Sequence, residues 1–505
     1  MAAHTHLSYN PSLTMSTFHI LNFGCRASQA DGAALKQQLL QSGHQEAANL
    51  EDSAVAILNT CTVTASADAE VRQFVRRIHR HNPECRILVT GCYAQRAPEE
   101  IAKLEGVAWV VGNSHKHLVS NILSTSASRD TGEQRENDLR INPNPPQNRT
   151  PLVQVQSEPP HRTSDFGPRT PDLIFPQPPA ANPQSLTSAT AELFVGEITE
   201  EFHFAPVFAD DRTRPTLKIQ DGCDARCSFC IIPTVRGQSR SLPPRTVLDQ
   251  VRQLVDTGYQ EVVLSGINLG GYGRDLDRSI NFIEMLERIL CETSIVRIRI
   301  SSIELMDVSP ALIRLVATEP RMAKHFHVPL QSGCDRILRL MNRRYWARHY
   351  AERMLAIHEQ IPNAALGADV MVGFPGETDQ DHAASLSFIE LIPFTYLHIF
   401  PFSARPGTPA AIAVGQVNGR VARERSQEIR SVIDVKRQAF LVAQVGQCLP
   451  ALTLDEIEDG ARVALTTNYL KVALPDAEMP PNNLVDVTVG RAVSGQLFGY
   501  ANYSR

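Results

Sequence analysis

The chain has 505 residues, 43% of them hydrophobic, and a formal net charge of -5. Its length predicts about three domains with sizeable cores, and its slightly negative charge gives no general affinity for nucleic acid. No apolar run reaches the roughly 18 residues of a membrane-spanning helix, and the N-terminus lacks the apolar core of a signal peptide. Ten cysteines in so long a chain fit a reducing compartment with metal sites. We therefore expect a cytoplasmic protein without a membrane segment.

The first domain is expected at residues 16–123, where apolar strands and amphipathic helices alternate. This alternation is typical of a parallel α/β sheet. The expected strands lie at 18–21, 54–58, 87–89 and 108–111, and the expected helices at 33–41 and 67–81.

Residues 124–205 break this pattern, because they are rich in Pro, Ser, Thr, Asn and Gln and contain few apolar anchors. Such a composition predicts a largely disordered insertion or linker. A loop that is ordered by a partner is the alternative.

The alternation returns in a second domain, expected at residues 206–436. Six strand–helix units favour a partial (β/α)6 barrel over a closed barrel of eight. The expected strands lie near 217–220, 262–265, 296–301, 326–330, 368–372 and 397–400.

A third domain is expected at residues 437–505, after a polar helix at 421–445. Short alternating strands at 448–454, 462–474, 485–493 and 497–500 predict a small antiparallel β-barrel, which is a common shape among nucleic-acid-binding domains. The predicted fold class of the whole chain is therefore α/β, with this small barrel at its C-terminal end.

Three cysteines stand close together in the second domain. Cys223, Cys227 and Cys230 form a C-x3-C-x2-C run, and three such thiolates can hold three irons of a [4Fe–4S] cube. The fourth iron is then open to chelation by S-adenosylmethionine, which an electron from the cluster can cleave to a 5′-deoxyadenosyl radical. The alternatives are a zinc site or unrelated core thiols, but zinc sites usually add a second C-x2-C unit or histidines, and none lies nearby.

Three more cysteines are far apart in sequence but equivalent in position. Cys25, Cys61 and Cys92 each follow the carboxyl end of an expected strand, and two of them are preceded by glycine. The carboxyl ends of parallel strands share one edge, so these thiols should converge on one crevice. Cys85 precedes its strand and should lie at the opposite edge. Buried thiols that merely fill turns are the alternative.

The motifs around these cysteines resemble those of the radical S-adenosylmethionine methylthiotransferases, and most of all the tRNA threonylcarbamoyladenosine branch. The resemblance covers nearly everything outside residues 1–15 and the insertion. It is carried by Asn22-Phe23-Gly24-Cys25-Arg26, Asn59-Thr60-Cys61-Thr62-Val63-Thr64, Thr90-Gly91-Cys92, Ile219-Gln220-Asp221-Gly222-Cys223 and Cys230-Ile231-Ile232-Pro233, followed by Arg236-Gly237 and Ser239-Arg240-Ser241. The chain departs from the family in its long insertion and in Ser28, where Asn is common.

This resemblance implies two [4Fe–4S] clusters and two S-adenosylmethionine molecules per reaction. Cys25, Cys61 and Cys92 would hold an auxiliary cluster, and the C-x3-C-x2-C cysteines the radical-generating one. The implied reaction adds a methylthio group to C2 of N6-threonylcarbamoyladenosine at position 37, next to the tRNA anticodon. The implied partners are the anticodon stem-loop, bound with help from a TRAM-like C-terminal domain, and an electron donor such as flavodoxin or ferredoxin. The layout is compatible with a monomer.

The cofactor contacts are expected at the carboxyl ends of the barrel strands, where active-site residues gather in such barrels. Turn chemistry or capping is the alternative role for each, and no catalytic residue is assigned beyond the cluster ligands. The expected contacts to S-adenosylmethionine are Gly266, Asn268, Ser302, Glu304, Gln331 and Asp369.

Two arginine stripes at helical spacing are candidates for contacts with RNA phosphates, with a solvated charged face as the alternative. They consist of Arg72, Arg76, Arg77 and Arg80, and of Arg336, Arg339, Arg343, Arg344 and Arg348. Three other functions stay open: methylthiolation of isopentenyladenosine in tRNA, methylthiolation of a ribosomal-protein aspartate, and a non-catalytic iron–sulfur carrier. A carrier would need neither the barrel nor the cofactor contacts.

Overall fold

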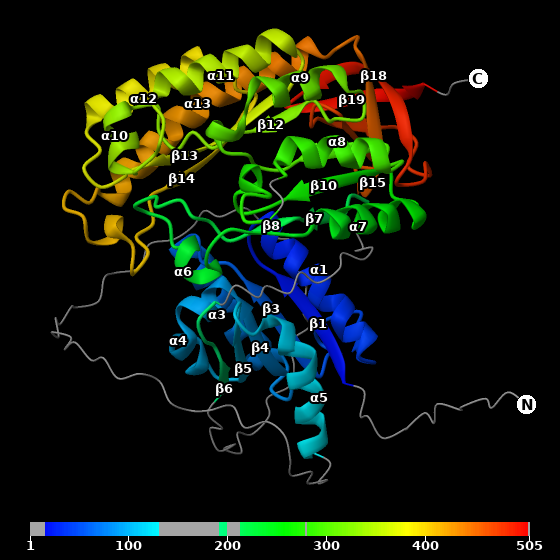
Figure 1. Ribbon diagram of the computed structural model, residues 1–505, viewed down its shortest axis with the longest axis vertical. Coiled ribbons are helices and arrows are strands. Elements are labelled where there is room, and N and C mark those ends of the chain that lie inside the picture. The colour runs from blue at the N-terminus through cyan, green and yellow to red at the C-terminus, as the bar shows by residue number, and fades with distance from the viewer. Residues whose placement is uncertain (1–15, 131–190, 199–212, 278–279, 503–505) are drawn as a thin grey trace, which may run out of the picture. The chain divides into compact units, whose positions relative to one another are not determined.

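The computed structural model describes residues 16–130, 191–198, 213–277 and 280–502 (Figure 1). Most of the expected insertion, at 131–190 and 199–205, lies outside these residues. Residues 15–123 and 189–505 belong to one unit, and every contact described below lies within it. No helix in the described ranges is long and apolar enough to cross a membrane.

The N-terminal part is a six-stranded parallel sheet in the order β2-β1-β3-β4-β5-β6, as the alternation predicted. Its central strands carry buried side chains to both faces, into one core with Ala56 and Leu58 and another with Val55 and Ile57. The strands are β1 (Thr17–Asn22), β2 (Gln45–Glu46), β3 (Val55–Thr60), β4 (Arg86–Gly91), β5 (Val107–Gly112) and β6 (Glu192–Phe194). The helices are α1 (Arg26–Gln41), α2 (Ala65–His81), α3 (Cys92–Arg96), α4 (Pro98–Ala102) and α5 (Val119–Asp130), with a 3-10 turn at Lys116–Leu118.

One expectation for this region was wrong, and one short strand was not expected. Helix α1 begins at Arg26 rather than near residue 33, because its first turns bury the polar residues Ser28 and Asp31, which hide the apolar pattern. Strand β6 lies inside the stretch that was expected to be disordered, and it pairs with β5 from Trp109 onward. A three-residue edge strand is too short to show a periodicity in the sequence.

The second part contains six parallel strands, as expected for the partial barrel. They form two three-stranded sheets, β11-β10-β7 and β12-β13-β14, which single parallel bridges join at Ile298–Met322 and Ser302–His327. The strands are β7 (Thr216–Lys218), β10 (Glu261–Ser265), β11 (Arg297–Ile300), β12 (His325–His327), β13 (Ala365–Val372) and β14 (Tyr396–Pro401). The short antiparallel pair β8 (Gln220–Asp221) and β9 (Arg240–Ser241) accompanies them.

Helices cover the outside of these strands (Figure 1). Leu217, Leu264 and Ile298 belong to the apolar core with these helices, whereas Glu261 and Arg299, which belong to the same strands, are buried and charged. The helices are α6 (Ile232–Arg236), α7 (Pro244–Asp256), α8 (Phe282–Glu292), α9 (Pro310–Thr318), α10 (Asp335–Leu340), α11 (Ala347–Gln360), α12 (Asp379–Leu391) and α13 (Gly419–Ala443), with 3-10 turns at Leu269–Gly271, Leu305–Asp307 and Pro409–Ile412.

The C-terminal part is a closed barrel in the order β15-β16-β17-β19-β18. The expectation of an antiparallel barrel needs correction, because β17 and β19 pair in parallel and the sheet is therefore mixed. The expected strand at 462–474 is also two strands, since a turn with Tyr469 at φ 65° divides it. The strands are β15 (Cys448–Glu458), β16 (Ala461–Thr466), β17 (Lys471–Leu474), β18 (Leu484–Val493) and β19 (Gln496–Asn502).

Candidate active site

The first cysteine constellation forms at the carboxyl edge of the N-terminal sheet, as predicted. Strands β1, β3 and β4 are neighbours in that sheet, and Thr60 pairs with Gly91. Cys61 and Cys92 therefore follow two directly paired residues, and Cys25 follows the adjacent strand β1. Cys85 precedes β4 and lies buried 3.7 Å from the Ser53 hydroxyl, as expected for a structural thiol.

Glycines allow this close approach of the chain. Gly24 and Gly91 have φ values of 101° and 100°, a region in which side chains are strained. A Cβ atom at Gly24 would lie only 2.3 Å from Cβ of Cys61. The backbone before Cys25 thus packs directly onto Cys61, which a larger residue would prevent.

The protein environment disfavours the thiolate form of Cys61 when no metal balances its charge. Burial, together with the neighbouring Cys25 and Cys92, raises the pKa of Cys61 to about 12. Cationic and amide donors nevertheless face Cys92, since Asn113 Nδ2 lies 3.4 Å and Arg236 Nε 3.3 Å from its Sγ. Cys25 Sγ lies 3.6 Å from the Ser28 hydroxyl, so the unusual Ser28 is at the site itself. Such donors are what thiolate ligands of a cluster receive from their surroundings.

A buried ion network lies beside this constellation. Arg236 donates to Asp221 and Asp31, in both cases at 3.0 Å. Lys218 pairs with both carboxylates, at 2.7 Å from Asp221, and Lys116 lies 3.1 Å from Asp31. Burial alone would raise the pKa of Asp31, but Lys116, Lys218 and Arg236 hold it far below its ordinary value. The network ties α1 of the N-terminal part to the strands that precede Cys223.

The second constellation lies in the loop after β8. Cys227 and Cys230 are joined by a backbone hydrogen bond of 3.2 Å, and Ala225 N lies 3.4 Å from Cys223 Sγ. Burial, with Cys227 and Cys223 close by, raises the pKa of Cys230 to about 12. The three thiols thus lie within electrostatic reach of one another.

The segment after α10 holds this loop in place. Ser228 Oγ donates to Leu340 O at 2.8 Å, and Asn342 Nδ2 donates to Arg226 O at 2.6 Å. Arg343 lies 3.5 Å from Cys227 Sγ and forms an ion pair with Glu304. Arg343 is therefore buried at this site, which corrects the expectation that it faces RNA.

Both constellations have the ligand number of a [4Fe–4S] cluster with one open iron. A [4Fe–4S] cube binds each thiolate to a different iron, so its ligands need not meet at one point. Three thiols in each constellation, with amide and guanidinium donors to their sulfurs, match that requirement.

Two of the expected cofactor contacts carry an unpaired oxygen. Asn268 Oδ1 and Gln331 Oε1 are buried and have no hydrogen-bond partner in the structure. Gln331 also has φ 64°, although it is not a glycine. A buried unpaired carbonyl oxygen is costly unless a ligand donates to it.

The other four expected contacts to S-adenosylmethionine have neighbours within the protein. A Cβ at Gly266 would meet Gln220 Oε1 at 2.9 Å, so Gly266 packs against that side chain. Ser302 bridges β11 to β12, and Glu304 is held by Arg343. Asp369 Oδ1 lies 3.3 Å from His327 Nε2.

A cavity of about 170 Å³ lies beside the second constellation. Cys230, Gln331 and Asp369 line one part of it, and Val63 and Thr64, which follow Cys61, line another. The cavity thus joins the neighbourhoods of both constellations. Gly266, Asn268, Ser302 and Glu304 are not part of its lining.

The arginine stripes are only partly available to RNA. Arg72 donates to Glu100 at 2.9 Å, and Arg336 pairs with Asp381. Five other members are exposed, namely Arg76, Arg80, Arg339, Arg344 and Arg348. Sequence spacing located the first stripe on α2, but the second stripe is not one helix face, because α10 ends at Leu340 and Arg343 and Arg344 lie in the turn before α11. The spacing also did not reveal which arginines have acidic partners in the fold.

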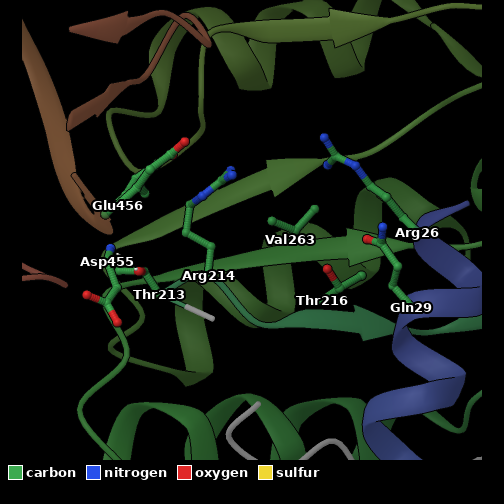
Figure 2. Close-up of a pocket in the computed structure, with 9 residues that line it drawn as sticks. Arg26, Gln29, Thr213, Arg214, Thr216, Val263, Asp455 and Glu456 are labelled. Carbon is green, nitrogen blue, oxygen red and sulfur yellow. Dashed lines mark hydrogen bonds between the residues drawn. The ribbon is translucent and has the colours of Figure 1, made fainter. Parts of the chain in front are cut away.

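A second, larger cavity of about 370 Å³ lies where all three parts of the chain meet. Figure 2 shows Arg26 of α1 and Arg214 on either side of Val263, with Thr216 below them and Glu456 of β15 at one end. Nothing in the sequence singled out Arg214. Arg26 appeared there only as part of the motif around Cys25.

Comparison with known proteins accounts for these features. Residues 17–112 match the model of the uncharacterized protein family UPF0004, and residues 217–389 match the radical SAM superfamily. The fold is similar to the radical S-adenosylmethionine methyltransferase TsrM of Kitasatospora setae, solved with cobalamin and a [4Fe–4S] cluster bound. That likeness has a TM-score of 0.50 at 13% identity, over 79% of this chain and 74% of that one. Fold and site thus define a radical S-adenosylmethionine enzyme.

Two curated relatives narrow the class. The threonylcarbamoyladenosine tRNA methylthiotransferase MtaB of Bacillus subtilis is 32% identical over 483 residues, which are 95% of this chain and 94% of that protein. The protein of the same name from Aquifex aeolicus is 34% identical over 453 residues, 89% of this chain and 94% of its own. The chain therefore belongs to this family of radical S-adenosylmethionine methylthiotransferases.

Proposed function

We propose that this enzyme transfers a methylthio group to C2 of N6-threonylcarbamoyladenosine at position 37 of tRNA. The observation that carries the proposal is the cavity of about 170 Å³ that Cys230 shares with Val63 and Thr64, next to Cys61. A reaction that needs both a radical source and a sulfur donor requires two cysteine constellations beside one enclosed space. The relatives with this name support the choice of nucleoside.

In this proposal Cys25, Cys61 and Cys92 hold an auxiliary [4Fe–4S] cluster, and Cys223, Cys227 and Cys230 hold the radical-generating one. When bound, the radical-generating cluster would supply the electron for cleavage of S-adenosylmethionine, and the auxiliary cluster would hold the sulfur to be transferred. Asn113 and Arg236 donate to Cys92 Sγ and so orient it as a cluster ligand. Arg343 does the same for Cys227.

The chain's own residues position S-adenosylmethionine. The unpaired oxygens of Gln331 and Asn268 are acceptors for an ammonium or amide donor. Asp369 adds a carboxylate to the cavity wall. The apolar side chains of Met371, Phe400 and Phe402 line the same cavity, and they exclude water from a reactive radical.

The proposal assigns residues 16–123 to a methylthiotransferase domain, 206–436 to the radical domain and 437–505 to a TRAM-like RNA-binding domain. A five-stranded closed barrel is a common platform for RNA. An anticodon loop suits the cavity, because its unstacked bases are reached without opening a duplex. The enzyme works as a cytoplasmic monomer that receives electrons from a flavodoxin or ferredoxin.

The test is mass analysis of nucleosides in total tRNA from cells that lack the gene, with and without a rescuing copy. Loss of 2-methylthio-N6-threonylcarbamoyladenosine, restored by the wild type but not by Cys61→Ala or Cys227→Ala, is expected. A matched control is Cys85→Ala, which alters a buried thiol outside both constellations.

Two results would contradict the proposal. Loss of the methylthiolated isopentenyl product would keep the chemistry and change the substrate. A nucleoside profile that does not depend on the gene would favour a ribosomal protein as the substrate.

A further inference from the structure

We propose that the cavity between Arg26 and Arg214 binds the carboxylate of the threonylcarbamoyl group and so selects the substrate. This inference rests on the proposed function and deepens it. Its starting point is the charge around the cavity of about 370 Å³ in Figure 2.

Guanidinium groups outnumber carboxylates in the interior of this region. Glu261 is fully buried, and its carboxylate forms ion pairs with three arginines. It lies 2.7 Å from Arg299, 3.5 Å from Arg214 and 3.6 Å from Arg297. Arg26 adds a fourth guanidinium, hydrogen-bonded at 2.9 Å to the hydroxyl of Tyr469. Arg297 and Arg299 are buried and Arg214 is only 22% exposed, and one carboxylate does not balance four cations, so a further anion would be stabilised there.

The acids at the end of the cavity do not fill this role. Glu456 lies 2.6 Å from Lys471, and Asp455 lies 3.5 Å from Arg462. Each thus has a cation of its own in β16 or β17, and the side chain of Asp455 is 72% exposed. Among the described residues, neither acid forms an ion pair with Arg26 or Arg214, which both line the cavity.

The position of Arg26 in the chain fits the N6 substituent of the substrate adenine. Arg26 directly follows Cys25, and consecutive Cα atoms lie about 3.8 Å apart. On adenine, the N6 substituent and C2 flank N1 on the same edge of the ring. A site that holds the N6 substituent beside Arg26 would therefore place C2 toward Cys25.

The other residues that line this cavity suit the hydroxyl and the amide linkage of the threonylcarbamoyl group. Threonylcarbamoyl carries a carboxylate that is ionised at neutral pH, a hydroxyl and an amide linkage. The hydroxyls of Thr213 and Thr216 and the amide of Gln29 line the same cavity, and Val263 and Leu454 supply apolar walls. An isopentenyl group has no charge to offer and would leave the arginines desolvated without a partner, which disfavours it.

A phosphate of the tRNA backbone is the other anion that such arginines bind. The two are distinguished with two anticodon stem-loop RNAs of the same sequence, one carrying the natural carboxylate and one the corresponding carboxamide. Binding to the holoenzyme is measured by fluorescence anisotropy, and methylthiolation by single-turnover kinetics. A backbone phosphate is present in both RNAs, so it cannot produce a preference between them.

The wild type is expected to prefer the carboxylate RNA by about 10- to 100-fold in both binding and kcat/KM. Arg214→Met should remove most of that preference by weakening only the carboxylate RNA, whereas Arg214→Lys should keep part of it. Arg245→Met, whose side chain is 94% exposed on α7, should behave as the wild type. Iron content and melting temperature show whether each variant folds.

Three outcomes would overturn the inference or its basis. Equal use of both RNAs by the wild type would show that the carboxylate is not recognised, while the proposed function would stand. An equal loss on both RNAs in Arg214→Met would assign Arg214 to the phosphate backbone. Methylthiolation of neither RNA by the active wild type would instead refute the proposed function. The wild-type comparison decides the matter even if Arg214→Met does not fold.

Discussion

Arg236 and Cys92 connect the two cysteine constellations. Arg236 is the last residue of α6, six residues after Cys230, yet its Nε lies 3.3 Å from Sγ of Cys92 in the N-terminal part. The same guanidinium lies 3.0 Å from Asp221, two residues before Cys223. One fully enclosed side chain thus fixes the distance between a proposed ligand of the auxiliary cluster and the loop of the radical cluster.

Replacement of Arg236 should therefore affect both stability and the auxiliary cluster. Arg236→Met leaves Asp31 and Asp221 with fewer cations in a buried site, and such a loss costs about 3–5 kcal/mol in the free energy of unfolding. It also removes a charged donor to the Cys92 thiolate, which should shift the reduction potential of that cluster. Urea denaturation and a spectroelectrochemical titration measure the two effects.

The matched control is again Arg245→Met, since Arg245 is exposed and lies 4.0 Å from Asp249. An Arg236→Met protein with unchanged potential would restrict Arg236 to a structural role. Unchanged stability as well would contradict the importance of the ion network.

The iron content of cysteine variants tests the ligand assignment directly. Cys61→Ala and Cys227→Ala should each retain about four irons per chain where the wild type holds about eight, because each removes a ligand from a different cluster. Cys227→Ala should also abolish the formation of 5′-deoxyadenosine, whereas Cys61→Ala should not. Iron analysis and chromatography of the reaction products provide the measurements.

Cys85→Ala and Cys334→Ala are the controls for these variants. Cys85 lies against Ser53, and Cys334 Sγ lies 3.2 Å from Asp381. Both should keep the full iron content. Loss of half the iron in either one would require a different ligand set.

The unpaired oxygen of Gln331 predicts a contact with S-adenosylmethionine. Gln331→Met removes the acceptor while keeping a long unbranched side chain, and it should weaken binding of S-adenosylmethionine about tenfold or more. Stability should change little, because no hydrogen bond of Gln331 Oε1 is lost in the ligand-free protein. Calorimetric titration of the holoenzyme measures the affinity.

Gln250→Met is a matched control for this variant. Gln250 Oε1 is also buried and unpaired, but it lies on α7, away from both constellations. Its replacement should leave the affinity unchanged. Equal weakening by both variants would mean that Gln331 acts only through general packing.

The positions of the six cysteines were predictable because they depend on rules local to the sequence. Cys25, Cys61 and Cys92 follow strands whose apolar runs are plain, and parallel pairing then brings their ends to one edge. The run from Cys223 to Cys230 carries its ligand spacing in itself. For the same reason the six strands of the partial barrel were predictable, while the parallel pairing of β17 with β19 was not, since alternation along a strand does not reveal its neighbour.

The charged contacts around the cysteines were not predictable. Arg236 meets Asp31 across 205 residues of sequence, and no spacing rule relates them. Arg343 lies in an apparent basic stripe, yet Glu304, 39 residues away, holds it beside Cys227. Such partners depend on how the parts of the chain pack, which the pattern of a single sequence does not specify.

The pH dependence of stability should reveal the charge of Glu261. Burial alone would raise the pKa of this carboxyl, but Arg299, Arg214 and Arg297 lower it to about 2. Because the pKa is lowered, the ionised carboxylate stabilises the folded protein at pH values above 4.5, the ordinary pKa of this group. This stabilisation is lost as the pH falls from 4.5 through about 2. Glu261→Gln has no such titration, so it should be the less stable protein at pH 7.

The difference between wild type and Glu261→Gln in the free energy of unfolding should therefore narrow in acid, by about 1 kcal/mol at pH 4 and about 3 kcal/mol at pH 2. Urea denaturation of both proteins across this range measures it, with the exposed Glu359→Gln as a control that should follow the wild type. A difference that is constant with pH would show that Glu261 is not ionised in the folded protein. The excess of positive charge that we infer around Arg26 and Arg214 would then be larger still, because no carboxylate would offset it.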